Sequence, residues 1–289
     1  MPQGLVLIDK EQGWTSHDAV AKLRGILGTR KIGHAGTLDP MATGLLVLGV
    51  NAGTKLLQFL VGAPKQYLAT IRLGMSTVTD DAEGETLEVI DASAITAEQV
   101  LNGIQKLTGD ILQTPSSVSA IKVDGKRAYD LVREGKEVEL KSRAVTISRF
   151  ELVSELRSFD GFVDLDVLVD CSSGTYIRAL ARDLGKDLGV GGHLTALRRT
   201  KVGNYSVEQA SKISGEISVL DLTTSAQLLY PEHRLSEQDE IDLRHGKRIP
   251  SGDQEMVVAI NPAGNLVAVL EKSGRDYKSV SVFPEVSNA

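Results

Sequence analysis

Residues 33–44 read Gly-His-Ala-Gly-Thr-Leu-Asp-Pro-Met-Ala-Thr-Gly and run directly into the apolar segment 45–50. Glycines let the backbone take unusual dihedral angles and let a ligand approach closely. Pro40 fixes its own φ angle and restricts the residue before it, so Asp39 is held on a tight turn before a buried strand. An Asp-Pro pair also starts ordinary turns. The flanking glycines and His34 favour a functional site here.

Three further stretches accompany this loop along the chain. They are residues 7–10 with 13–18, residues 65–67 with 73–74 and 79–84, and residues 171–178. The loop fits the pattern G-H-x-G-x-L-D-P-x-A-T-G at every fixed position. The four stretches resemble the motifs of the bacterial TruB family of tRNA pseudouridine synthases, and the resemblance covers residues 4 to about 205. Four motifs in order are a far more specific signal than one loop.

The resemblance implies an isomerase that converts uridine 55 in the T loop of tRNA to pseudouridine. This reaction breaks the N1–C1′ bond, turns the base and rejoins it through C5, so it is redox-neutral and needs no cofactor. Asp39 is the implied catalytic carboxylate, and three roles stay open for it: attack on the ribose, attack on the base, or removal of a ribose proton.

Two more residues complete the catalytic set that the resemblance implies. Arg178 matches a guanidinium that holds the aspartate ionised. Tyr67 matches a tyrosine that stacks on the target base, and its hydroxyl helps to remove the C5 proton. The ordinary alternatives are an arginine on a helix surface and a tyrosine at the start of a strand.

The same resemblance implies contacts with the tRNA substrate. The target base must leave the folded T loop, and His34 matches a histidine that fills the space left by flipped nucleotides. Leu197 matches an apolar residue under the base. The alternatives are a loop histidine bonded to nearby backbone and a core leucine. The other residues implied to bind the substrate are Lys10, Tyr176, Lys122, Arg198 and Arg199.

The total charge argues against a nucleic-acid partner unless the cations cluster. The 289-residue chain carries a formal net charge of −6, whereas nucleic-acid-binding proteins usually show a basic surface. Local clustering decides affinity, however. Basic clusters occur at residues 30–31, 122–127, 141–143, 198–201 and 244–248. An isolated cluster is more often a solvated surface, but several of these lie beside the motifs.

Other features of the composition narrow the class of protein. No apolar run approaches the roughly 20 residues of a membrane span, and residues 1–4 lack the character of a signal peptide. Cys171 is the single cysteine, which fits a reducing cytoplasm. The five histidines are scattered, so no metal site is predicted. We expect a cytoplasmic monomer that binds the T stem-loop of tRNA, with no membrane and no protein partner.

Hydrophobic periodicity predicts a mixture of strands and helices. Strands are expected at residues 5–8, 45–50, 67–73 and 162–169. Helices are expected from a Ser16 cap to Gly28, from a Thr96 capping box to about Leu107, and from Thr175 to Leu188. Without strict βαβ alternation, this order favours an α+β fold with a mixed, largely antiparallel sheet and flanking helices. The resemblance implies the pseudouridine synthase fold.

Two domains are expected. Residues 1–232 would form the catalytic domain, with an insert at about 115–145 that resembles the family's tRNA-gripping thumb or is an ordinary hairpin and helix. Residues 233–289 alternate apolar runs with a turn at 261–265 and predict a small all-β module. By its position in the family this module would be a PUA-like RNA-binding domain.

Two other functions stay open at this stage. One is a tRNA-binding folding chaperone, and the other is a synthase of this fold that acts on a different RNA. The chain also departs from the family pattern at Glu11, which replaces a usual proline, and at Ser117 and Val118 in the thumb segment. These departures put RNA contacts in doubt rather than the reaction.

Overall fold

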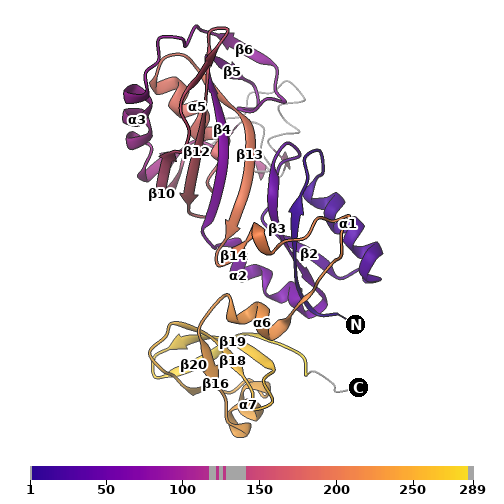
Figure 1. Ribbon diagram of the computed structural model, residues 1–289. Coiled ribbons are helices and arrows are strands. Elements are labelled where there is room, and N and C mark those ends of the chain that lie inside the picture. The colour runs from indigo at the N-terminus through magenta and orange to yellow at the C-terminus, as the bar shows by residue number, and fades with distance from the viewer. Residues whose placement is uncertain (1, 117–121, 124–125, 128–140, 286–289) are drawn as a thin grey trace. The chain divides into compact units, whose positions relative to one another are not determined.

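The computed structural model describes residues 2–116, 122–123, 126–127 and 141–285 of the chain. It contains two compact units (Figure 1). Unit 1 comprises residues 1–40, 44–61 and 201–289, and Unit 2 comprises residues 41–43 and 62–200. The expected domain boundary between residues 232 and 233 stays a prediction.

The first sheet of Unit 1 is antiparallel. Strand β1 (Gly4–Lys10) pairs with β3 (Thr43–Val50) and with the short β15 (Leu220–Asp221). Strand β2 (Ile32–Ala35) pairs with the other edge of β3. β1 and β3 are buried along nearly their whole length, which is why both read as continuous apolar runs in the sequence. Both predicted strands are confirmed.

Helix α1 (Ser16–Leu27) follows β1, and local sequence determines where it begins and ends. Thr15 caps it, with its Oγ1 accepting a hydrogen bond from the Asp18 amide at 3.1 Å, and Gly28 ends it in a left-handed conformation at φ 62°. The prediction of a Ser16 cap is therefore wrong. Its buried face is formed by Ser16, Ala19, Val20 and Leu23, whereas Ile26 is 45 % exposed.

Short elements complete the N-terminal and central parts of Unit 1. They are η1 (Asn51–Lys55), α2 (Leu57–Val61), β14 (Tyr205–Ser206), η2 (Val207–Gln209) and α6 (Leu222–Gln227).

The C-terminal part of Unit 1 forms its own five-stranded sheet in the order β16-β18-β19-β20-β17. Its strands are β16 (Glu232–Arg234), β17 (Ile249–Pro250), β18 (Met256–Ile260), β19 (Leu266–Ser273) and β20 (Asp276–Val282). Nine buried side chains form its core, among them Leu243, Val267 and Tyr277. The predicted small β module is confirmed, although helix α7 (Glu237–Arg244) shows that it is not purely β.

Unit 2 is built on a sheet in the order β13-β4-β12-β10-β7. Its strands are β13 (Gly192–Val202), β4 (Lys65–Leu73), β12 (Phe162–Cys171), β10 (Arg143–Leu152) and β7 (Gly109–Gln113). β12 runs antiparallel to both β4 and β10. Helix α5 (Ile177–Asp187) packs on β4, and helix α3 (Ala97–Lys106) packs on β10 (Figure 1). The α+β fold with a largely antiparallel sheet is confirmed.

Smaller strands of Unit 2 pair outside this order. They are β5 (Met75–Thr77) with β6 (Thr86–Val89), β8 (Lys122–Val123) with β9 (Lys126–Arg127), and β11 (Arg157–Phe159) with β12. Most of the predicted insert at 115–145 lies outside the described residues.

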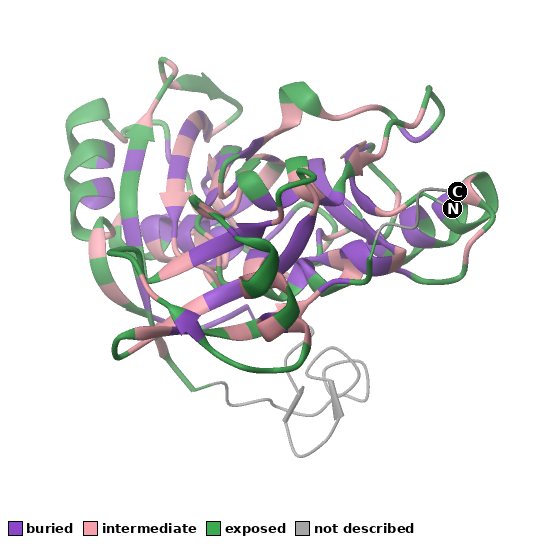
Figure 2. Cartoon of the chain, turned by 90° about the horizontal axis from the view of Figure 1, so that it is seen from below, coloured by how far each residue is buried: buried purple, intermediate pink, exposed green. Residues whose placement is uncertain are grey.

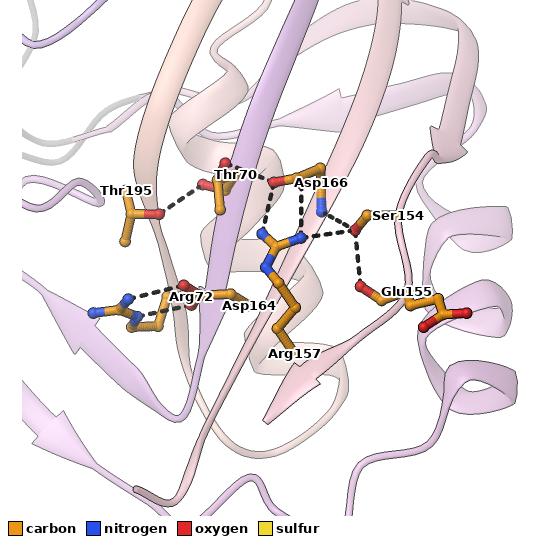
Figure 3. Close-up of polar contacts among 8 residues, drawn as sticks. All are labelled: Thr70, Arg72, Ser154, Glu155, Arg157, Asp164, Asp166 and Thr195. Atoms are coloured by element: carbon orange, nitrogen blue, oxygen red, sulfur yellow. Dashed lines mark hydrogen bonds and ion pairs between the residues drawn. The ribbon is translucent and has the colours of Figure 1, made fainter. Parts of the chain in front are cut away.

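The strands of Unit 2 bury one face and expose polar groups on the other, as the alternating colours of Figure 2 show. On the polar face, Arg72 contacts both oxygens of Asp164 at 2.8 Å (Figure 3). Asp166 accepts hydrogen bonds from Thr70 at 2.7 Å and from Arg157. These cross-strand pairs fix the register of β4 against β12. The register in turn fixes which side chains of β4, including Tyr67, point into the buried face.

No helix in the described ranges is long and apolar enough to cross a membrane.

Candidate active site

The Asp39 turn connects β2 to β3, and its residues 36–40 belong to Unit 1. Gly36 has φ 83°, a conformation that favours glycine. Ser16, at the start of α1, anchors the turn: its hydroxyl accepts from the Leu38 amide at 2.9 Å and donates to the Leu38 carbonyl at 3.3 Å. This anchoring role of Ser16 was not predicted from the sequence. The signal for it was the Ser16 hydroxyl, which is not needed as a cap because Thr15 caps the helix.

Lys10 braces the same turn from β1. The side chain is 2 % exposed, and its ammonium donates to the carbonyls of Trp14 at 2.6 Å, Glu11 at 3.1 Å and Pro40 at 3.4 Å. The Gly13 amide also donates to the Pro40 carbonyl, at 2.9 Å. The loop before α1 is thereby tied to the residue that follows Asp39.

His34 lies on β2, where it is opposite Leu48 of β3. Its ring packs edge-on against His17, with 5.7 Å between centroids. His34 and the half-buried Asp39 are thus carried by one strand and the turn that follows it.

Unit 2 carries Tyr67 and Leu197, each 8 % exposed, on β4 and β13. The segment Met41–Thr43, which follows Asp39 and Pro40 in the chain, also belongs to Unit 2. There the Thr43 hydroxyl forms a long hydrogen bond of 3.5 Å with the Leu197 carbonyl.

Arg178 lies in the first turn of α5 and is 6 % exposed, so it is not a surface arginine. Its Nη1 donates to the Thr79 carbonyl at 2.8 Å and lies 3.2 Å from an oxygen of Asp81. Asp81 is held in place by hydrogen bonds from the Thr79 hydroxyl and the Glu83 amide. The loop after β5 thus orients a buried guanidinium.

A second arginine, one turn further along α5, uses the same loop. Arg182 contacts Asp80 at 3.2 Å and donates to the Thr114 carbonyl at 2.7 Å. Burial raises the pKa of Asp80 above its ordinary value, and the charge of Arg182 opposes this shift. Asp80 has φ 58°, and its carbonyl accepts from the Leu194 amide at 3.1 Å. Asp80 and Asp81 are adjacent in the sequence, and Arg178 and Arg182 are one helical turn apart. This spacing was the sequence signal that the loop pairs with the helix.

The remaining predicted site residues differ in exposure. Tyr176 and Arg198 are half-buried, and Arg199 is 1 % exposed. Lys122 is opposite Arg127 in the pairing of β8 with β9. The structure describes only the backbone of Lys122. Unit 1 therefore carries Lys10, His34 and Asp39, whereas Unit 2 carries Tyr67, Tyr176, Arg178, Leu197, Arg198 and Arg199. In the described ranges, no group of three or more His, Cys, Asp or Glu side chains is arranged to hold a metal ion.

Solved structures identify the class of fold. A chain in the "Structure of H/ACA RNP bound to a substrate RNA containing 2'-deoxyuridine" has a TM-score of 0.71 at 21 % identity, covering 98 % of this chain and 85 % of that one. A chain in the "Crystal Structure of a Cbf5-Nop10-Gar1 Complex" has a TM-score of 0.72 at 23 % identity, with the same coverage. The chain has the pseudouridine synthase fold.

Sequence comparison identifies the family. The model of the N-terminal domain of TruB family pseudouridylate synthases matches residues 24–177, and two TruB C-terminal models match residues 178–235 and 230–284. The tRNA pseudouridine synthase B of Paenarthrobacter aurescens (strain TC1) is 54 % identical over 98 % of this chain and 96 % of its own length. That of Leifsonia xyli subsp. xyli (strain CTCB07) is 54 % identical over 97 % of this chain. The chain belongs to the TruB family of pseudouridylate synthases.

Proposed function

We propose that the chain isomerises uridine 55 in the T loop of tRNA to pseudouridine. The observation that carries this proposal is the 54 % identity to a protein named tRNA pseudouridine synthase B, because the match extends over 98 % of the chain. The Asp39 turn supports it, since one carboxylate is held there on a braced loop. The partner is the T stem-loop of tRNA, and the enzyme works as a cytoplasmic monomer without a cofactor.

Asp39 is the catalytic carboxylate in this proposal. The N1–C1′ bond of the uridine breaks, the base turns, and a C5–C1′ bond forms; C5 then loses its proton and N1 gains one. Arg178 supplies the positive charge of the catalytic set. Tyr67 stacks on the base and assists removal of the C5 proton.

The other site residues take two kinds of role. His34, Tyr176 and Leu197 accommodate the flipped nucleotide, and Lys122 and Arg198 contact the RNA backbone. Lys10 and Arg199 act from inside the protein, because both side chains are almost completely buried. Lys10 braces the turn that presents Asp39, and residues 233–289 add RNA-binding surface.

Pseudouridine mapping on a defined RNA tests the proposal. Unmodified tRNA transcript is incubated with the protein alone, and pseudouridine is mapped along the whole RNA. A transcript with cytidine at position 55 is the control. We expect one pseudouridine, at position 55, in the first RNA and none in the control. Modification at another position, or of the control, would indicate a different substrate, and binding without modification would favour the chaperone function.

A further inference from the structure

Tyr176 is held by its backbone at the start of α5. The Gln113 side chain accepts a hydrogen bond from the Tyr176 amide at 2.8 Å and donates one to the Tyr176 carbonyl at 3.1 Å. Gln113 is completely buried at the end of β7. A single amide side chain therefore fixes both backbone polar groups of the residue that precedes the first turn of the helix, two positions before Arg178.

Arg143 contacts the ring of the same tyrosine. Its guanidinium carbon lies 4.7 Å from the centroid of the Tyr176 ring, within the distance of a cation–π contact. Arg143 begins β10, where it lies directly opposite Gln113 of β7. Two neighbouring residues on adjacent strands thus converge on one tyrosine, one on its backbone and the other on its ring.

Two nitrogens of the Arg143 guanidinium have no hydrogen bond among the described residues. Nε and Nη2 of Arg143 are buried and have no hydrogen-bond partner in the described part of the chain. Buried donors without partners cost stability, so hydrogen bonds from these two nitrogens do not explain the position of this half-buried side chain. A planar guanidinium stacks on an aromatic ring, whereas the ammonium of lysine does not reproduce this contact.

We propose that Arg143 is a positioning residue for Tyr176, which it holds by stacking on one face of the ring. The opposite face is then available to the target uridine. This inference rests on the proposed function, in which Tyr176 contacts the flipped nucleotide. Arg143 acts through the tyrosine ring and not by binding a phosphate.

A double-mutant cycle tests this coupling. Single-turnover pseudouridine formation is measured at saturating enzyme for wild type, Arg143→Met, Arg143→Lys, Tyr176→Leu and the double variant Arg143→Met/Tyr176→Leu. Thermal unfolding checks that each variant is folded. The matched control is Arg149→Met, because Arg149 is on the same strand but is exposed and paired with Glu151.

The expected result is a loss that depends on the ring. Arg143→Met slows the reaction by about 2- to 30-fold, the range of a cation–π contact, and Arg143→Lys is intermediate. In the Tyr176→Leu background the same change alters the rate by less than about twofold. The salt dependence of tRNA binding stays that of wild type, and Arg149→Met behaves as wild type.

Two results would overturn the inference. One is an equal loss on Arg143→Met with and without the Tyr176 ring. The other is a normal saturated rate together with a salt slope reduced by about one, the signature of a lost phosphate contact. Wild-type protein without turnover would instead refute the proposed function, and this inference with it.

Discussion

Lys65 is a buried lysine two residues before Tyr67 on β4. Its ammonium donates to the Ala63 carbonyl at 2.8 Å, and the side chain is 8 % exposed. Burial lowers the pKa of Lys65 to about 8, and the nearby charge of Arg199 adds to this effect. In the unfolded chain the pKa of a lysine is about 10.4. Between these two values the unfolded state binds more protons, so this group makes the protein more stable as the pH rises.

The pH dependence of unfolding tests this buried charge. We expect the stability of wild type relative to Lys65→Met to increase as the pH rises from about 8 towards 10. Urea unfolding at several pH values measures the difference. Lys106→Met is the control, since Lys106 is exposed and paired with Asp187. If the difference in stability stays constant over this pH range, folding does not lower the pKa of Lys65.

In the proposed reaction the ring and the hydroxyl of Tyr67 have separable roles. Tyr67→Phe keeps the ring proposed to stack on the base and removes the hydroxyl proposed to assist loss of the C5 proton. We expect unchanged tRNA affinity and a single-turnover rate reduced at least tenfold, a barrier change of about 1.4 kcal/mol. Tyr67→Leu should also weaken binding. Normal turnover by Tyr67→Phe beside a slow Tyr67→Leu would assign the whole effect to stacking.

Helix α5 carries Arg178, and its contact with the start of β13 depends on glycine. A Cβ atom on Gly185 would lie 2.2 Å from the Gly191 carbonyl carbon, which is too close for any side chain. The Gly191 amide also donates to the Gly185 carbonyl at 3.0 Å. The backbones of helix and turn therefore meet directly, and this contact sets how far α5 lies from the sheet.

Two glycine-to-alanine changes test this close approach. Gly185→Ala should lower stability by about 1–3 kcal/mol, the usual cost of overpacking. Gly25→Ala in α1 should raise it by roughly 0.5–1 kcal/mol, because nothing lies within 4 Å of the added Cβ. Thermal unfolding measures both. Equal effects of the two substitutions would contradict the packing of α5 against the Gly191 turn.

Elements set by local sequence were predicted well. The alternation at residues 67–73 became β4, with its burial pattern as expected, and Thr96 forms the predicted capping box of α3. Long-range contacts were not predictable in this way. Arg178 and Thr79 are 99 residues apart in the chain, and periodicity reports only which face of an element is buried. The hydroxyl of Ser16 fits both a cap and an anchor, and only the tertiary structure distinguishes the two.

At the scale of the whole molecule, the basic cluster at residues 244–248 is largely neutralised by neighbouring acidic side chains. In the C-terminal module, Arg244 pairs with Glu240 and Glu285, and Lys247 pairs with Asp242 at 2.9 Å. Arg248 has a 3.5 Å contact with the Ser273 hydroxyl and no ion pair among the described residues. A cation that is already paired must exchange one anion for another when it binds a phosphate. Arg248 is therefore the strongest phosphate ligand we expect in the 244–248 cluster.

The salt dependence of tRNA binding tests this distribution. Affinity should fall steeply with salt although the net charge is −6, because counterions are released from the RNA. Arg248→Gln should weaken binding and reduce the salt slope by about one. Lys247→Gln is the matched control and should have a smaller effect on both. Equal slopes for Arg248→Gln and wild type would exclude Arg248 from the RNA contact.

The proposed reaction depends on one carboxylate, so Asp39→Asn tests the function most directly. The amide keeps the shape of the side chain and removes its charge. Single-turnover pseudouridine formation and tRNA affinity are measured for wild type, Asp39→Asn and the control Asp91→Asn, whose aspartate lies in an exposed turn and accepts from the Ser93 amide at 2.8 Å. We predict that Asp39→Asn binds tRNA as wild type does and forms no pseudouridine, while the control is fully active. Turnover by Asp39→Asn within tenfold of wild type, a barrier change below about 1.4 kcal/mol, would contradict the assignment of Asp39 as the catalytic residue.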